Sequence, residues 1–380
     1  MVGDANRRGY RHLLVSFWDE ARAHGLPLPT EEPVSAASFC SARPKITCDL
    51  LKHVLHQIAT DALGAEGHCP QRWHGRRVFA ADGAKINLQR GPDLERTFGV
   101  PEGAHCPQAL VSILFDVCTK LPVDVEVSSF ATSEREHLFT MLPSLAAGDV
   151  LVLDRGYPSH EILQALVQDK IDFLVRVPSA NTFSVIDDLR SSGSSGRDVT
   201  VKPPVGSPDH WCPLELRAVK LRAPDGSESY FLTALPRSEF GPTELAELYH
   251  MRWSVEEFFK LSKGSYIGQG QFRSKSSTGV IQEIHALVLF LAITRLCMSA
   301  AAVTSGQEYS ELSQKGAVLA VADYVTRILL AEDEQHALLA LQALFRRMLR
   351  VHEKHRPGRS FPRRSFQPAP RWGPTGRRGG

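Results

Sequence analysis

The stretch YHMRWSVEEFFKLSK, residues Tyr249–Lys263, contains neither Gly nor Pro, and its apolar residues recur at helical intervals. This periodicity predicts one continuous helix. We expect the helix to begin at Thr243, because a hydroxyl can cap the first turn and the acids Glu244 and Glu247 suit the positive end of the helix dipole. The apolar residues that share one face, and that are expected to be buried, are Leu245, Leu248, Met251, Val255, Phe258 and Phe259.

A polar stripe runs beside this apolar face. Each helical residue advances by about 100°, so Tyr249, Arg252, Glu256 and Lys263 fall on one side of the predicted helix. A phenol, two cations and one carboxylate suit an anionic substrate and a metal ion better than they suit bare solvent. The alternative is an ordinary solvated face, on which Arg252 and Glu256 form a surface ion pair one turn apart.

Two aspartates lie upstream, each directly after a predicted strand. The strand Arg77–Ala81 leads into Asp82, and the buried strand Val150–Leu153 leads into Asp154. One such aspartate alone is typical of a turn. Two at matching positions, with a third carboxylate at Glu256, favour a shared site, because ligands collect at the carboxyl ends of strands in open α/β sheets.

The segments between these residues predict a mixed α/β sheet. Three strands can form an antiparallel meander, and the helix–strand–helix–strand order that follows implies parallel neighbours. A β insertion is expected over 178–241, before the helix quoted above. The further expected strands are Ala109–Val117, Val123–Ser128, Asp172–Val177, Asp198–Lys202, Pro213–Leu221 and Ser229–Leu235, with helices over Glu134–Leu145 and Ser159–Lys170.

The rest of the chain divides by its composition. Residues 1–72 predict a helical region that could bind DNA or could simply pack against the body. We expect the main domain to comprise residues 73–177 and 242–305. C-terminal helices are expected over 306–352. Residues 353–380 are rich in Arg, Pro and Gly, which indicates a disordered basic tail.

Bulk composition excludes several classes of protein. A hydrophobic content of 43% and a net charge of +2 are ordinary for a soluble protein, so any nucleic-acid site must come from local clustering of charge. Seven cysteines without a CxxC pair indicate neither a disulfide framework nor a zinc site. The start MVGDANRRGY lacks an apolar core, and the run Ala286–Thr294 is too short to span a bilayer. We therefore expect a cytoplasmic protein.

The three acids point to phosphoryl transfer. Carboxylates that meet at one cleft repel each other, and hard divalent cations relieve that repulsion. Mg²⁺ prefers a few carboxylates, waters and phosphate oxygens, and Mn²⁺ is expected to substitute for it. Paired ions can activate a nucleophile and stabilise the leaving oxygen. Arg252, Lys263 and Tyr249 would then contact phosphates, which predicts metal-dependent cleavage or transfer of phosphodiester bonds.

Several motifs resemble those of the IS-four family of bacterial insertion-sequence transposases. Tyr249-x2-Arg252-x3-Glu256-x6-Lys263 has the spacing of the family's signature, with Trp253 after the Arg and Glu257-Phe258 after the Glu. The stretch LDRGY at 153–157 is similar to the motif of the second aspartate, and AADG at 80–83 is similar to that of the first. SFCSAR at 38–43 resembles the amino-terminal region, so the resemblance covers 35–300.

The resemblance implies a ribonuclease-H-like fold interrupted by a β insertion. Asp82, Asp154 and Glu256 would be the catalytic, metal-binding triad. The residues that would contact double-stranded transposon-end DNA are Tyr249, Arg252, Trp253 and Lys263. A homodimer on paired ends in the nucleoid would cleave them and join them to target DNA. The alternatives are a catalytically silent DNA-binding descendant and a metal-dependent nuclease without strand transfer.

Overall fold

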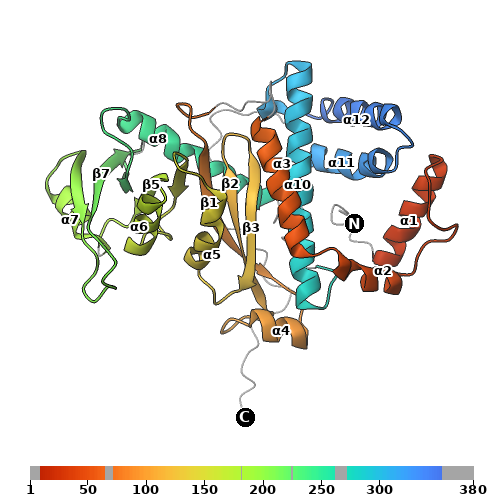
Figure 1. Cartoon of the computed structure of the whole chain (residues 1–380), viewed down its shortest axis with the longest axis horizontal. Helices are drawn as coiled ribbons and strands as arrows, with labels where there is room; N and C mark the ends of the chain where they lie inside the picture. Colours follow the sequence, from red (N-terminus) through yellow and green to blue (C-terminus); the bar gives the residue numbers. More distant parts are fainter. Residues whose placement is uncertain (1–8, 65–71, 181, 224–225, 262–271, 353–380) are drawn as a thin grey trace, which may run out of the picture.

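The computed structural model describes residues 9–64, 72–180, 182–223, 226–261 and 272–352. One eight-stranded mixed sheet runs through the molecule in the order β3-β2-β1-β4-β5-β8-β7-β6 (Figure 1). Its strands are β1 (Val78–Asn87), β2 (Gln108–Asp116), β3 (Leu121–Ser129), β4 (Val150–Leu153), β5 (Asp172–Val177), β6 (Gly196–Val201), β7 (Leu214–Arg222) and β8 (Glu228–Thr233). This sheet confirms the expected mixed α/β class and agrees with a ribonuclease-H-like fold.

The strand pairing follows the predicted order. β1, β2 and β3 form an antiparallel meander, and β4 and β5 continue the sheet parallel to β1. The insertion strands do not form a sheet of their own: β8 pairs antiparallel with β5 and carries β7 and β6 outward. Figure 1 shows β7 at the far end of the molecule from α11 and α12.

Helices cover both faces of the sheet. One core packs between the sheet and α3, α8, α9 and α10, and a second packs between the sheet and α5, α6 and α7. The described helices are α1 (Tyr10–Ala23), α2 (Ala36–Ala42), α3 (Cys48–Gly64), α4 (Pro92–Phe98), α5 (Glu134–Met141), α6 (His160–Gln168), α7 (Ser184–Ser191), α8 (Pro242–Met251), α9 (Trp253–Leu261), α10 (Ser277–Ser305), α11 (Gln314–Leu329) and α12 (Glu334–Met348).

Alternation along β1 decides which side chains meet which helices. Phe79 and Ala81 enter the core under α5 and α6, whereas Ala80 and Ala84 enter the core under α9 and α10. Each large apolar side chain that is fully buried contributes about 1.5–3 kcal/mol. The alternation of side chains along β1 therefore places Asp82 on the same face of the sheet as Ala80 and Ala84.

Three expectations about the elements were wrong. The stretch from 242 to 261 is two helices, α8 and α9, with a turn at Arg252 between them. Thr243 is not the cap, since α8 starts at Pro242 after Gly241, which makes no side-chain cap hydrogen bond. The insertion also contains the helix α7, whose apolar residues Ile186 and Leu189 are buried although the surrounding sequence is polar.

The helix α10 confirms the long apolar helix that the sequence predicts over Val280–Ala302, and it extends a few residues further at both ends. It continues through Arg295 to Ser305, and its length and composition alone would suffice to cross a membrane. Half of its most apolar window is buried inside the protein, as in the core helix of a globular fold. Arg295 is tolerated there because its Nη1 donates to the Lys120 carbonyl (2.9 Å) and its guanidinium lies over the rings of Phe115 and Phe258.

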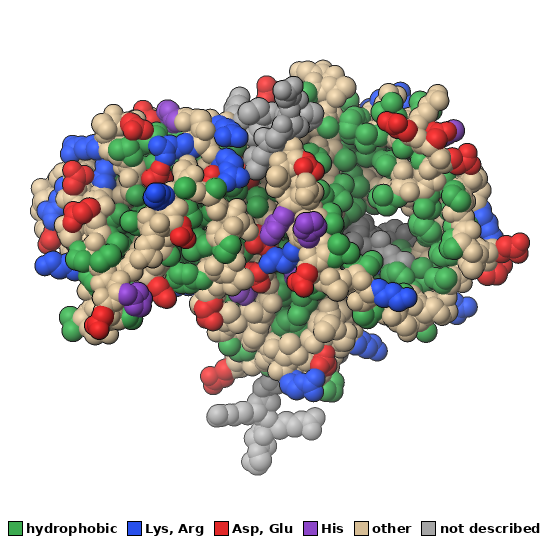
Figure 2. Space-filling model, viewed as in Figure 1, with side chains coloured by type: hydrophobic (Ala, Val, Ile, Leu, Met, Phe, Trp, Pro, Cys, Tyr) green, Lys and Arg blue, Asp and Glu red, His purple; other side chains and the backbone are tan. Residues whose placement is uncertain are grey.

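The N-terminal helices are tied to this body by charged side chains. Lys52 of α3 binds Asp124 of β3 at 3.0 Å. Arg43 donates to Gln282 (2.9 Å) and pairs with the buried Glu283 of α10 (3.1 Å). In the space-filling view, Lys and Arg side chains gather over α8 and the insertion strands, with acids among them (Figure 2). Basic and acidic side chains are therefore interspersed on this face of the protein.

Candidate active site

Asp82 lies in β1, and Asp154 directly follows the neighbouring parallel strand β4. Ala80 of β1 is paired with Val152 of β4. Two further residues along each strand lead from Ala80 to Asp82 and from Val152 to Asp154, so the same register aligns the two acids. Val152 also enters the core under α9 and α10, as Ala80 does. Alternation therefore directs both carboxylates to the face that carries α9.

Asp82 does not stand at a strand's carboxyl end, which corrects our expectation. It lies inside β1, which continues to Asn87 through an antiparallel pairing of Asp82 with Ile113. β4, however, stops at Leu153. The side of β1 that faces β4 has no partner after Ala80, and that gap supplies the strand-end cleft that the sequence indicates.

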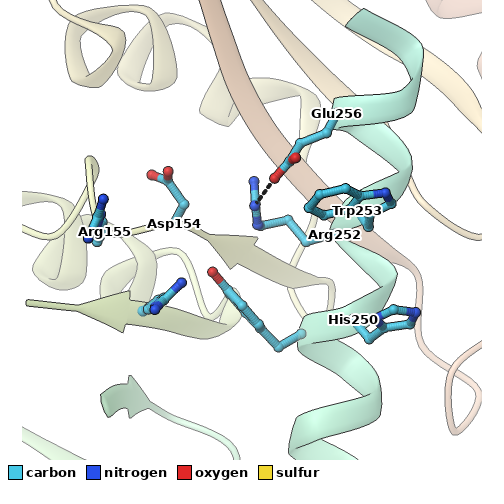
Figure 3. A pocket seen from close by; sticks show the side chains of 8 residues that line it. Asp154, Arg155, His250, Arg252, Trp253 and Glu256 are labelled. Atoms are coloured by element: carbon cyan, nitrogen blue, oxygen red, sulfur yellow. Dashed lines mark hydrogen bonds and ion pairs between the residues drawn. The ribbon is translucent and has the colours of Figure 1, made fainter. Parts of the chain in front are cut away.

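Asp154 stabilises the turn after β4 and also lines the pocket of the candidate site. Its Oδ1 accepts the backbone N–H of Gly156 at 2.8 Å, which is the ordinary turn role of an aspartate. Its carboxylate also lines a pocket of about 440 Å³ (Figure 3). The other residues that line this pocket are Arg155, Arg176, Tyr249, His250, Arg252, Trp253 and Glu256.

The turn between α8 and α9 places Arg252 in the middle of the site. Its carbonyl accepts from the N–H of Val255 at 3.1 Å, a contact three residues apart that tightens the chain. Arg252 is only 8% exposed, and its Nη2 donates to Glu256 Oε1 at 2.5 Å. Its guanidinium also lies 5.6 Å from the centre of the Tyr249 ring. The pair is thus partly buried, unlike an ordinary surface ion pair.

Arg252 separates the acids of the triad. In Figure 3 its guanidinium lies between Asp154 and Glu256. Burial tends to lower the pKa of Arg252, but the phenol of Tyr249 and the charges of Glu256 and Asp82 raise it overall. Burial is also the main reason why the pKa of Asp82 is raised to about 6, with Arg252 opposing the shift and the charges of Glu134 and Asp154 adding to it. The acids therefore repel one another around one cation.

The three acids of the site are ligands of the chemical type that a divalent cation prefers. Asp82, Asp154 and Glu256 offer the hard oxygen ligands that Mg²⁺ and Mn²⁺ prefer. Across the ranges that the structure describes, however, no three His, Cys, Asp or Glu side chains stand close enough together to hold a metal ion. In this structure the Glu256 carboxylate is paired with the guanidinium of Arg252.

Two arginines of the pocket were missed from the sequence. Arg155 follows Asp154 directly in the LDRGY motif, and that adjacency could have marked it. Arg176 gives no local signal, because it lies in the apolar strand β5. The pairing of Leu153 with Val175 places Arg176 next to Asp154 in the sheet, so only strand register reveals it.

The expected DNA-contacting residues fall into two groups. Tyr249, Arg252 and Trp253 line the pocket, and Trp253 is 36% exposed. Lys263 lies outside the described residues. His250, which was not expected, also lines the pocket, although Figure 3 shows its ring directed away from Asp154.

A hairpin on the far side of α9 holds this helix in place. The Nζ of Lys120 donates to the hydroxyl of Ser254 at 2.7 Å, two residues before Glu256. Lys120 lies in the turn between β2 and β3 with a φ of 62°, which is unusual for a side chain of this size. Arg295 binds the carbonyl of the same Lys120. Glu256 is thereby positioned by contacts that its own sequence neighbourhood does not contain.

The chain is similar to two known proteins. The chain is 22% identical over 170 residues to the Escherichia coli (strain K12) protein named "Putative transposase InsZ"; the match covers 43% of this chain and 56% of InsZ. A piggyBac transposase synaptic complex with hairpin DNA aligns with a TM-score of 0.43 and 11% identity, covering 74% of this chain and 59% of that one. The chain thus spans little more than half the length of either protein.

A family match covers the elements that carry the candidate site. The profile of the transposase DDE domain matches residues 73–294, which include β1 with Asp82, the turn after β4 with Asp154, and α9 with Glu256. The matched segment is more than half of the 380 residues. This chain therefore belongs to the family of proteins with a transposase DDE domain.

Proposed function

We propose that this protein is a transposase that cleaves the ends of a mobile DNA element and joins them to target DNA. The observation that carries the proposal is the register of Asp82 with Asp154, next to a pocket that Glu256 shares with three arginines. Carboxylates beside guanidinium groups suit a site that must hold both a divalent cation and a phosphodiester. The signature spacing from Tyr249 to Glu256 supports a placement in the IS-four family.

The acids would hold Mg²⁺, or Mn²⁺ in its place. Asp82, Asp154 and Glu256 are the ligands in this proposal, and the bound cation supplies activation of the attacking oxygen and neutralisation of charge on the phosphate. Each ligand is held by a different feature of the fold. Asp82 is fixed by β1, Asp154 by the hydrogen bond to Gly156, and Glu256 by the contact of Ser254 with Lys120.

The arginines bind and orient the DNA. Arg155 and Arg176 flank Asp154, where they can contact the phosphates on either side of the bond to be broken. Arg252 has two partners in turn: Glu256 in the free protein and a phosphate in the complex. When its guanidinium moves to the phosphate, the carboxylate of Glu256 becomes available. Tyr249 can donate its hydroxyl to a phosphate oxygen, and Trp253 offers an exposed ring beside it.

The wider organisation follows the same proposal. The catalytic domain comprises residues 73–177 and 242–305, interrupted by the insertion 178–241. The helical region 1–72 and the basic segment 353–380 assist DNA binding. A homodimer would hold two transposon ends in the nucleoid, so that the ends are cleaved and joined as a pair.

A strand-transfer assay tests the proposal. The DNA that borders the gene is searched for terminal inverted repeats, and an oligonucleotide that carries one is incubated with protein, plasmid and Mg²⁺. We expect joined products, their loss in Asp154→Asn, and unchanged DNA affinity in that variant. Asp169→Asn, an exposed aspartate at the end of α6, is the matched control and should retain activity.

The alternatives give distinct results in the same assay. Cleavage without joining would indicate a metal-dependent nuclease. DNA binding without either reaction, under Mg²⁺ and under Mn²⁺, would indicate a catalytically silent descendant. Full activity in Asp154→Asn would contradict the proposed site.

A further inference from the structure

The insertion supplies part of the surface under α8. β8 lies antiparallel to β5, and Phe231 of β8 stands directly opposite Arg176 of β5. Side chains of directly opposed residues project from the same face of a sheet. Phe231 belongs to the core that packs against α8, as Leu245 and Leu248 of that helix do. Arg176 and Phe231 are therefore neighbours on the face of the sheet that carries α8.

The ring of Phe231 contacts the ring of Tyr249 in α8. The two ring centres are 4.8 Å apart and the ring planes are inclined at 71°, which is the edge-to-face arrangement that aromatic pairs favour. Phe231 is only 1% exposed, whereas Tyr249 is partly buried and lines the pocket of the candidate site. A buried residue of the insertion thus holds a ring that is part of the pocket.

A second contact restrains the same ring. The guanidinium of Arg252 lies 5.6 Å from the centre of the Tyr249 ring, within the range of a cation–π interaction. Arg252 is itself held by Glu256 (Figure 3). Tyr249 is therefore held at two points, one in the insertion and one at the turn between α8 and α9. Without the insertion contact, the ring keeps only the Arg252 contact and can turn about its side-chain bonds.

Ordinary core packing explains the burial of Phe231, but it does not explain the position of Arg176. Arg176 lines the pocket and is partly exposed, and it forms no ion pair with any acid in the part of the chain that the structure describes. A partly buried guanidinium without a carboxylate partner suits an anionic ligand. Phe231 adjoins two residues of the pocket, as the cross-strand neighbour of Arg176 and the ring partner of Tyr249.

We propose that Phe231 is a positioning residue for DNA binding, because its contact with the Tyr249 ring places the phenol hydroxyl beside Arg176, where both can contact one phosphate of the bound strand. This inference rests on the proposed function and adds to it. The hydroxyl and the guanidinium are both hydrogen-bond donors, and a phosphate oxygen accepts from such groups. The insertion thereby shapes the pocket through a residue that does not itself touch DNA.

The contact is tested first in the free protein. The full chain is labelled with 3-fluorotyrosine, and the ¹⁹F NMR signal that disappears in Tyr249→Phe belongs to Tyr249. Phe231→Leu keeps an apolar side chain but removes the ring, so it should shift this signal. Leu232→Val is the matched control, because Leu232 follows Phe231 in β8 and is fully buried in the core on the opposite face. The control should leave the signal unchanged, and an unshifted signal in Phe231→Leu would overturn the proposal.

DNA affinity is then measured by fluorescence anisotropy, with a duplex oligonucleotide that carries an inverted repeat from the DNA bordering the gene. Phe231→Leu and Tyr249→Phe should each weaken binding by about 2–10-fold. In the Tyr249→Phe background the hydroxyl is already absent, so Phe231→Leu should then change affinity by less than about 2-fold. The slope of affinity against salt should stay unchanged in Phe231→Leu, since no charged contact is lost. Leu232→Val should lower the melting temperature without changing DNA affinity.

The outcomes separate this inference from the proposed function. If Tyr249→Phe weakens DNA binding but Phe231→Leu does not, Phe231 is not a positioning residue and the transposase proposal stands. Losses that simply add in the double variant would also overturn the inference, as would a smaller salt slope in Phe231→Leu, which would show that charged contacts had been lost. If the unaltered protein binds no DNA, the proposed function fails and this inference fails with it. Should Phe231→Leu fail to fold by circular dichroism, Phe231→Met is measured in its place, with the same expected results.

Discussion

Arg252 forms an ion pair with Glu256 at the point where one helix gives way to the next, and the pair is largely shielded from water. A guanidinium in this position neutralises the acids of the site in the free protein. The same group is available to a DNA phosphate. Under the proposed function, the charge on Arg252 would link the state of the acids to the presence of DNA, because it cannot serve both partners at once.

Arg252→Gln should separate these two roles. Without the guanidinium, DNA affinity is expected to fall for all sequences, and the slope of binding against salt should decrease by about one phosphate contact. The acids lose their cation, so Mn²⁺ should raise the melting temperature of Arg252→Gln more than that of the unaltered protein. Fluorescence anisotropy across a salt series and thermal melts with Mn²⁺ measure both effects.

Arg155→Gln is the matched control for this variant. Arg155 lines the same pocket, but among the described residues it has no ion pair with Glu256. The Arg155→Gln variant should have a lower DNA affinity, but Mn²⁺ should raise its melting temperature no more than it raises that of the unaltered protein. An equal Mn²⁺ effect in both variants would contradict the special role of Arg252.

Asp82→Asn should stabilise the protein in the presence of a chelator. The pKa of Asp82 rises from the ordinary 3.8 to about 6, mainly through burial. A raised pKa means that the folded state favours the protonated form. This contribution to stability is present below pH 3.8, is lost as the pH rises towards 6, and is absent above that. The gain at pH 7 should be on the order of 2–3 kcal/mol.

Urea denaturation between pH 4 and pH 8 checks the effect. The difference in unfolding free energy between Asp82→Asn and the unaltered protein should shrink as the pH falls from 6 to 4. A difference that does not depend on pH would show that the asparagine acts through packing. Asp169→Asn should show no such trend.

Ser254→Ala should loosen the helix that carries Glu256. The ammonium group of Lys120 loses its acceptor while it remains half-buried, which should cost about 1.5–3 kcal/mol. Urea denaturation measures the loss. Ser41→Ala, an exposed serine in α2, should change stability by less than about 0.5 kcal/mol. Equal losses of stability in the two variants would show that the hydrogen bond from Lys120 to Ser254 does not stabilise α9.

Arg295→Ala should be strongly destabilising, and Arg295→Met much less so. The alanine leaves a cavity between Phe115 and Phe258 and deprives the Lys120 carbonyl of a donor, at a cost of about 3 kcal/mol or more. Methionine refills the space between the two rings. If chemical denaturation gave equal losses for both variants, the hydrogen bond rather than the packing would dominate.

Periodicity gave a reliable account of the elements because burial imposes it. The strands near Val150 and Asp172 and the helices α5 and α6 lie close to where alternation and capping residues predict them. The same reasoning failed at Arg252, where the apolar pattern continues across a turn. It also placed the end of β1 too early, since a strand that pairs on one side only can run past a polar residue such as Asp82.

The sequence by itself determined the mixed α/β class, the motifs that carry the three acids, and the residue types that suit a cation and a phosphate. These features are local, because spacing and side-chain chemistry can be read along the chain. Only the tertiary structure decided that Asp82 aligns with Asp154, that Arg176 joins them, that Phe231 contacts Tyr249, and that Arg252 holds Glu256. Such relations depend on strand register and on helices that pack against the sheet, and no pattern within a single segment records them.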